Sequence, residues 1–169
     1  DEDYPQRLLE CDDAPLMLYY KGNASLQAPR VVSIVGTRHA TPYGRSFVET
    51  FVRDLADVFP DTLIVSGLAY GIDVTAHRAA LRCGLPTVGV LAHGLNTIYP
   101  AQHRNTAVEM LQCGGLLTEY SSQQTVHKGF FLARNRIVAG VADAVVVVES
   151  GVKGGSLFTA NIAGDYHRD

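Results

Sequence analysis

The chain has 169 residues, of which 47% are hydrophobic and 18% are charged. This composition predicts one compact domain with a sizeable core and argues against intrinsic disorder. The formal charge of −3 does not exclude a nucleic-acid partner, because six of the 17 acidic residues lie within residues 1–13. The rest of the chain carries 13 basic and 11 acidic side chains, and residues 121–142 carry three bases and no acid. A local basic patch is therefore compatible with the overall charge.

Cysteine usage and hydropathy indicate where the protein works. Cys11, Cys83 and Cys113 are odd in number, form no C-x-x-C pair and have no histidine at metal-ligand spacing. This pattern fits a reducing compartment and predicts neither a disulfide framework nor a metal site. No basic-then-apolar leader begins the sequence, and no apolar run approaches the ~20 residues that span a bilayer. We therefore expect a cytoplasmic protein that does not bind membranes.

Residues 1–30 form a lead-in segment that is expected to pack on the core, and residues 31–169 form the main domain. The lead-in has an acidic start, a candidate strand at residues 16–20 and a loop at 21–29. The apolar, β-branched run that follows, at residues 31–35, suits a strand buried on both faces. Gly36 would then allow a turn and the close approach of a ligand.

A phosphate site is expected directly after this first strand. Thr41 and Pro42 are typical of a helix N-cap and of the first helical position. Backbone N–H groups at such a helix start, with Arg38 beside them, favour a bound phosphate.

Strands and helices alternate through the rest of the chain. Apolar residues at helical spacing predict a helix that ends before Pro60, and Gly84 is expected as the left-handed C-cap of the next one. The expected strands are residues 63–66, 87–91, 116–120 and 144–148. The expected helices are residues 72–83, 101–112 and 130–139, with a stop at residues 114–115, and a last helix that opens at residues 154–156.

This alternation predicts an α/β fold: a three-layer, doubly wound and mostly parallel sheet with helices on both faces. Ligands of such sheets bind beyond the carboxyl ends of the strands. The loops that carry Arg38, Ser66 with Gly67, Lys128, and Gly155 with Ser156 would therefore converge there. Any one of these glycines could serve turn geometry alone, but their arrangement at one edge favours anion binding. Neither G-x-G-x-x-G nor G-x-x-x-x-G-K-[ST] is present, so NAD and ATP lose their main sequence support.

The basic segment at residues 128–136 is the second candidate. Lys128 and Gly129 lie at an expected helix N-terminus, which suits an anion. Arg134 and Arg136 are about 200° apart around a helix, so one is expected to contact ligand and the other structure. Phe131 lies next to these cations, where an aromatic ring could stack on a nucleic-acid base or instead belong to the core.

Catalytic chemistry has little support in the sequence. Ser66 lacks a G-x-S-x-G elbow, and no H-E-x-x-H motif occurs. Glu119 and Glu149 could act as paired acids, but loop capping is the better interpretation. His77 and His103 are expected on the polar surface.

Five ordered motifs together resemble the DNA-processing protein A family, also called Smf or DprA. They are Ser-Ile-Val-Gly-Thr-Arg at 33–38, Ser-Gly-Leu-Ala-Tyr-Gly-Ile-Asp at 66–73, Gly-Leu-Asn-Thr-Ile-Tyr-Pro at 94–100, Arg-Asn-Arg-Ile-Val-Ala-Gly at 134–140 and Gly-Ser-Leu-Phe-Thr-Ala at 155–160. The resemblance implies an extended Rossmann-like domain that binds single-stranded DNA and loads the RecA recombinase during natural transformation. It also implies a homodimer with no enzymatic activity and no cofactor.

The family's basic pocket maps onto Arg38 and Lys128, and its phosphate-side loops map onto Gly67 and Ser156. His93, the proline-free loop at 121–127 and Ala142 depart from the family pattern and put the loop shape in question. The family's closing strand and winged-helix tail would follow the last helix, so we expect this chain to be a fragment of the family's core. The full predicted single-stranded-DNA site is Gly36, Thr37, Arg38, Ser66, Gly67, Lys128, Gly129, Phe131, Arg134, Asn135, Arg136, Gly155 and Ser156.

A nucleotide-processing enzyme is the alternative function. Phosphoribohydrolases of a related fold bind a nucleoside monophosphate at the same strand ends. Their Pro-Gly-Gly-x-Gly-Thr-x-x-Glu signature is absent, and residues 114–119 resemble it only loosely. The sequence therefore favours binding over catalysis.

Overall fold

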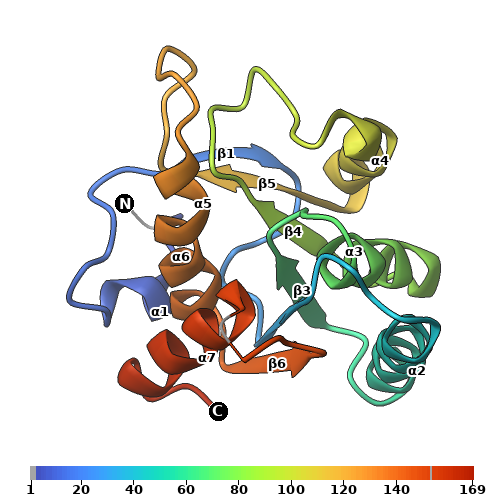
Figure 1. The fold of residues 1–169 in the computed structure, drawn as a ribbon. Coiled ribbons are helices and arrows are strands. Elements are labelled where there is room, and N and C mark those ends of the chain that lie inside the picture. Colours follow the sequence, from blue (N-terminus) through green and yellow to red (C-terminus); the bar gives the residue numbers. More distant parts are fainter. Residues whose placement is uncertain (1–2, 153) are drawn as a thin grey trace.

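The computed structural model describes residues 3–152 and 154–169 and has three layers, with a twisted sheet between two layers of helices (Figure 1). The strands are β1 (Tyr19–Gly22), β2 (Arg30–Gly36), β3 (Thr62–Ser66), β4 (Thr87–Val90), β5 (Gly114–Thr118) and β6 (Ala144–Val148). Their order in the sheet is β1-β5-β4-β3-β2-β6. Only the pairing of β1 with β5 is antiparallel among these described strands. The predicted doubly wound, mostly parallel fold is therefore confirmed.

The helices divide between the two faces of the sheet (Figure 1). One face carries α2 (Pro42–Val58), α3 (Ile72–Cys83) and α4 (Arg104–Cys113), which a short 3-10 turn, η1 (Ala101–His103), precedes. The other face carries α1 (Gln6–Leu9), α6 (Asn135–Gly140) and α7 (Gly155–Asp165), with α5 (Lys128–Ala133) leading into α6. No helix in the described ranges is long and apolar enough to cross a membrane.

Each face of the central strand β2 faces its own part of the core. Val31 and Val35 pack with Ile137 and Val138 of α6 on one side of the sheet. Ile34 packs with residues of α2 and α3 on the other side. Burial on both faces explains why the strand has no polar alternation.

The predicted helix boundaries hold where a specific cap fixes them. The Thr41 hydroxyl accepts a hydrogen bond from the Gly44 N–H at 3.1 Å, with Pro42 as the first helical residue of α2. Gly84 caps α3 with a φ of 72°, in the left-handed region. His77 and His103, which were expected on the surface, are buried instead. His77 contacts Thr87, and His103 contacts the Leu68 carbonyl.

Three elements differ from expectation. Strand β1 begins at Tyr19, three residues later than predicted, and the short α1 was not foreseen. The predicted stop at Gly114 and Gly115 is wrong, because both residues lie within β5. A Cβ at Gly114 would lie 1.9 Å from the Thr87 carbonyl oxygen, and one at Gly115 would lie 2.4 Å from the Tyr20 ring. These glycines therefore permit close strand packing rather than ending a helix.

The lead-in segment is held against the main domain by polar contacts. Arg7 pairs with Asp143 at 2.6 Å, and Glu10 pairs with Arg168 at 3.0 Å. Leu8 is buried against the main core. The lead-in segment thus places α1 on the face of the sheet that α6 covers, while β1 extends the sheet at its edge.

Candidate functional site

A cavity of about 300 Å³ lies beyond the carboxyl ends of β2 and β6, where the loops were expected to converge. Eight of the predicted site residues line it: Gly36, Thr37, Arg38, Phe131, Arg134, Asn135, Gly155 and Ser156. Val35, Ala69, Asp73, Gly151, Gly154 and Thr159 complete its wall. We call it the strand-edge cavity.

The loop that carries Arg38 is fixed by backbone hydrogen bonds. The Thr37 N–H donates to the Glu149 carbonyl at 2.7 Å, and the Thr37 carbonyl accepts from the Ile72 N–H at 3.1 Å. The Arg38 side chain is exposed and forms no ion pair with any residue that the structure describes. A fixed backbone with an uncommitted guanidinium suits the binding of an external anion.

Gly36 has a different role from the one expected. A Cβ at this position would lie 2.0 Å from the Val148 carbonyl oxygen and 2.5 Å from Cγ1 of Ile72. The close approach that requires glycine is therefore that of strand β6 and helix α3. The expected approach of a ligand is not what excludes a side chain at Gly36.

Arg134 forms the buried base of the site. Its side chain donates from Nη1 to the carbonyl oxygens of Gly67 and Val90, at 2.7 and 2.5 Å. Burial lowers the pKa of Arg134, and the Asp73 carboxylate offsets part of that shift. Burial likewise raises the pKa of Asp73, while Arg134 and the backbone N–H groups of Ala69 and Gly67 act against the shift. The opposite charges of Asp73 and Arg134 thus act on each other inside the protein, and Arg38 carries the exposed charge.

The start of α7 supplies backbone donors. The N–H groups of Leu157 and Phe158 turn back to the Gly154 carbonyl. Within the described ranges, no acceptor is assigned to the backbone N–H groups of Gly155 and Ser156, which line the cavity. Such first-turn N–H groups, with the positive end of the helix dipole, favour a phosphate oxygen.

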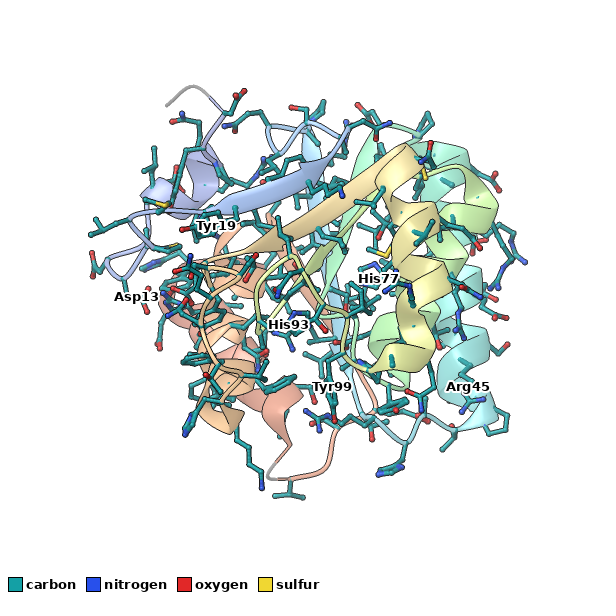
Figure 2. All side chains as sticks on the ribbon, turned by 90° about the horizontal axis from the view of Figure 1, so that it is seen from above. Asp13, Tyr19, Arg45, His77, His93 and Tyr99 are labelled. Carbon is teal, nitrogen blue, oxygen red and sulfur yellow. The ribbon has the colours of Figure 1, made fainter. Side chains whose placement is uncertain are left out.

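Aromatic rings border the cavity on the side of the β4 loop. Phe131 is half-buried and meets Tyr99 edge-on, with ring centroids 5.4 Å apart. Both rings line a narrow cleft with Arg38, Tyr70 and Arg134. Figure 2 shows Tyr99 near His93, whose Nε2 accepts a hydrogen bond from the Tyr99 N–H at 3.3 Å. His93 thus helps to hold the loop that presents this ring.

Tyr70 and Tyr99 were not among the predicted site residues. Both rings are more than a third exposed, and both come from loops that follow parallel strands. That position was the available signal, because such loops gather at one edge of the sheet. In the sequence, these two tyrosines stand in the same kind of loop as the predicted charges and glycines.

The other predicted site residues lie outside the strand-edge cavity. Gly67 lines the adjoining cleft, while Ser66 is buried and donates to the Ile34 carbonyl at 2.6 Å. Lys128 and Gly129 are exposed at the start of α5, and neither lines the cavity or the cleft. The contribution of Lys128 to binding therefore stays a prediction.

Arg136 is engaged by acidic side chains. It forms two hydrogen bonds to the Glu119 carboxylate, at 2.6 and 2.7 Å, and lies 3.6 Å from an Asp13 oxygen. Both arginines therefore have structural partners, and which of the two contacts ligand stays a prediction. Arg134 lines the cavity, and Arg136 joins α6 to the β5 loop and the lead-in segment.

Glu149, the other candidate acid, caps α2. Its carboxylate accepts hydrogen bonds from the Thr41 hydroxyl and from the Thr41 N–H, the latter at 2.9 Å. These hydrogen bonds lower the pKa of Glu149. Within residues 3–152 and 154–169, no group of three His, Cys, Asp or Glu side chains is placed to hold a metal ion.

The fold and the site define a Rossmann-like binding domain with a basic, glycine-lined cavity and aromatic rings at the strand ends. The model of the family described as DNA recombination-mediator protein A matches residues 1–169, and the chain belongs to this family. The DNA processing protein DprA of Streptococcus pneumoniae is 38% identical over all of this chain and 59% of its own length. A putative DprA of Mycobacterium tuberculosis is 45% identical over 91% of this chain and 40% of its own length. The chain thus spans about half the length of these relatives.

Solved structures of DprA proteins support the same family membership. DprA from S. pneumoniae superposes with a TM-score of 0.93 at 39% identity, over all of this chain and 59% of that one. A structure concerned with the single-stranded DNA binding mode of DprA from Helicobacter pylori has a TM-score of 0.89 at 35% identity, over 97% of this chain and 74% of that one. A molybdenum cofactor binding protein from Rippkaea orientalis, at 16% identity and a TM-score of 0.58 over 84% of this chain and 74% of that one, shares the fold alone.

Proposed function

We propose that this chain binds single-stranded DNA without sequence preference at the strand-edge cavity and acts by binding rather than by catalysis. The observation that carries the proposal is the joint lining of that cavity by Arg38, Phe131 and the first N–H groups of α7. A cation and backbone donors can hold the phosphate chain, while an aromatic ring stacks on any base. The family and the H. pylori relative's single-stranded DNA binding mode support this proposal.

The arrangement of the acids supports binding over the alternative phosphoribohydrolase. Asp73 is the one acidic side chain among the described residues that line the cavity, and it accepts hydrogen bonds from the Gly67 and Ala69 N–H groups. Glu119 and Glu149 are engaged with Arg136 and Thr41. No described carboxylate in the cavity is free to act as a general base on a nucleotide.

One experiment tests this proposal against the enzyme. The protein is titrated with fluorescent single- and double-stranded oligonucleotides, and in parallel it is incubated with nucleoside monophosphates while free base is measured. We expect preferential single-strand binding and no base release. Binding that is equal for both forms would contradict the single-strand proposal, and release of free base would establish the enzyme instead.

We further propose that the protein works in the cytoplasm, as a homodimer, to load RecA recombinase onto single-stranded DNA during natural transformation. Membership of the family supports this role. Light scattering measures the mass in solution, and RecA filament assembly on single-stranded DNA is followed with and without the protein. A monomer, or a filament rate that the protein leaves unchanged, would remove that part of the proposal.

A further inference from the structure

A second, larger cavity of about 790 Å³ continues from the strand-edge cavity along the outer surface of the α2–α3 layer. We call it the helix groove. Its walls include Arg45 and Glu49 from α2 and Arg78 and Arg82 from α3. Arg38 and Tyr70 line both this groove and the aromatic cleft beside the strand-edge cavity. The helix groove and the strand-edge cavity therefore adjoin each other at Arg38.

The helix groove is strongly basic on a chain whose formal charge is −3. Four arginines line it against one acidic side chain, Glu49. Glu49 pairs with Arg82 at 2.9 Å, and both side chains are more than half exposed. Arg45 and Arg78 form no ion pair with any residue in the described ranges. Exposed cations left without acids indicate a polyanionic partner.

The arginines repeat along the groove. Arg78 and Arg82 are one helical turn apart on α3, which places their backbones about 6 Å apart along the helix axis. Arg78 donates from Nε to the Thr106 hydroxyl at 3.2 Å, which orients its guanidinium and leaves its other nitrogens available. A row of oriented guanidinium groups suits a partner whose charges also repeat, as the phosphates of a nucleic-acid strand do.

We propose that the helix groove carries the sugar-phosphate backbone of the same single strand onward from the strand-edge cavity, with Arg78 and Arg82 contacting successive phosphates. This inference rests on the proposed function. Tyr70 lies at the junction, 39% exposed, with its ring held edge-on against His103 at 5.1 Å and its hydroxyl hydrogen-bonded to Gln102. It is placed to stack on a base where the strand passes from one region to the other.

The continuity of the two regions favours nucleic acid over an acidic protein segment. Arg38 lines both regions, so a strand held by Arg38 already lies at the entrance of the groove. An acidic protein partner would gain nothing from this connection. That partner is nevertheless an outcome that the experiment can reveal.

The test uses oligothymidylates of about 5 and about 20 nucleotides, which bracket the footprint of about 4–16 nucleotides typical of a single-strand-binding module. Affinities are measured at several salt concentrations for wild type, Arg38→Ala, and the double variant Arg78→Ala/Arg82→Ala. The matched control is Arg30→Ala. Arg30 lies at the opposite end of β2 and pairs with Asp61 at 2.8 Å, so its removal also leaves one exposed carboxylate unpaired.

We expect the double variant to bind the short oligomer like wild type and the long oligomer more weakly. With the long oligomer, the log–log salt slope should be flatter by roughly 1.4, or about 0.7 for each lost phosphate contact. Arg38→Ala should weaken both, and Arg30→Ala neither. If Arg38→Ala weakens binding while the double variant binds the long oligomer like wild type, the groove proposal is wrong and the strand-edge site stands; an acidic protein then becomes its candidate partner. If wild type binds no single strand, both proposals fail.

Discussion

Arg134 and Gly67 fit each other at the base of the strand-edge cavity. The arginine Nη1 donates to the Gly67 carbonyl oxygen at 2.7 Å, and a Cβ at Gly67 would lie 2.7 Å from the same guanidinium. The glycine therefore leaves room for a buried cation that ties the β3 loop and the end of β4 to α6. The position of Arg134 at the base of the cavity therefore depends on the absence of a side chain at Gly67.

Gly67→Ala should displace Arg134 from its two carbonyl partners. Leaving these buried groups poorly paired should cost about 1–3 kcal/mol of unfolding free energy, measured by urea denaturation. Gly164→Ala is the control, because it lies in α7 with nothing within 4 Å of its added Cβ. This control should stabilise by about 0.5–1 kcal/mol through helix propensity. Equal stability of Gly67→Ala and wild type would contradict the packing argument.

Phe131→Ala and Phe130→Ala separate stacking on DNA from stacking within the protein. Phe131 lines the strand-edge cavity, whereas Phe130 stacks on Tyr120 with centroids 4.1 Å apart and lines neither the cavity nor the cleft. Phe131→Ala should weaken single-strand binding by about 1–3 kcal/mol with an unchanged salt slope. Phe130→Ala should lower the melting temperature and leave the affinity of the folded protein intact. The reverse pattern in paired melting and binding experiments would rule out stacking on Phe131.

Local signals predicted much of the fold. Thr41, Pro42 and Gly84 mark helix ends through their own backbone chemistry, so they could be identified without a structure. Gly114 and Gly115 were likewise expected to mark the end of a helix, but they lie within β5. Their missing side chains accommodate Thr87 and Tyr20, which are distant in sequence. A single sequence does not reveal which neighbour requires a glycine.

The site was predictable as a location and less so as a set of contacts. The parallel-sheet rule correctly brought Arg38, Gly155 and Ser156 to one cavity, whereas Ser66 and Lys128, which it also placed there, lie outside it. Helical geometry separated Arg134 from Arg136, but the partner that engages Arg136 is Glu119, in a loop 17 residues away. Such pairing depends on how the elements pack against one another, which periodicity alone does not encode.

Gly36→Val tests whether that glycine serves the fold or the ligand. Its Cβ would overlap the Val148 carbonyl and Ile72, so we expect loss of β2–β6 pairing and a protein that melts far below wild type. If Gly36 instead served the approach of a ligand, the sheet would survive the substitution and only DNA binding would be lost. Circular dichroism melting distinguishes these outcomes, and a normally stable variant that fails to bind would restore the ligand explanation.

His77 should make stability depend on pH. Burial, helped by His103 and Arg134, lowers the pKa of His77 to about 3. The unfolded chain, with a histidine pKa near 6.5, therefore binds the proton more readily than the folded one. The contribution of neutral His77 to the free energy of unfolding is complete above about pH 6.5. It is lost as pH falls toward 3, at up to about 1.4 kcal/mol per pH unit. Urea denaturation from pH 7.5 to 5 should show this slope, and it should flatten in His77→Asn but not in the exposed-site control His39→Gln.

Arg38 and Lys128 are the two exposed cations that the sequence assigned to DNA, and the structure distinguishes their surroundings. Arg38 lines the strand-edge cavity, whereas Lys128 lies at the start of α5 beyond its wall. Wild type should show a log–log salt slope of roughly −1.5 to −3 for two to four phosphate contacts, at about −0.7 each.

Arg38→Ala should flatten that slope by roughly 0.7 with any oligomer, because the contact lies where the strand enters the site. Lys128→Ala should flatten the slope only with an oligomer long enough to extend past Phe131 to the first residue of α5. Salt titrations of both variants with short and long oligothymidylates measure the difference. A Lys128→Ala effect on the shortest oligomer that binds would instead place the lysine inside the site, and a wild-type slope near zero would refute phosphate contacts as the basis of binding.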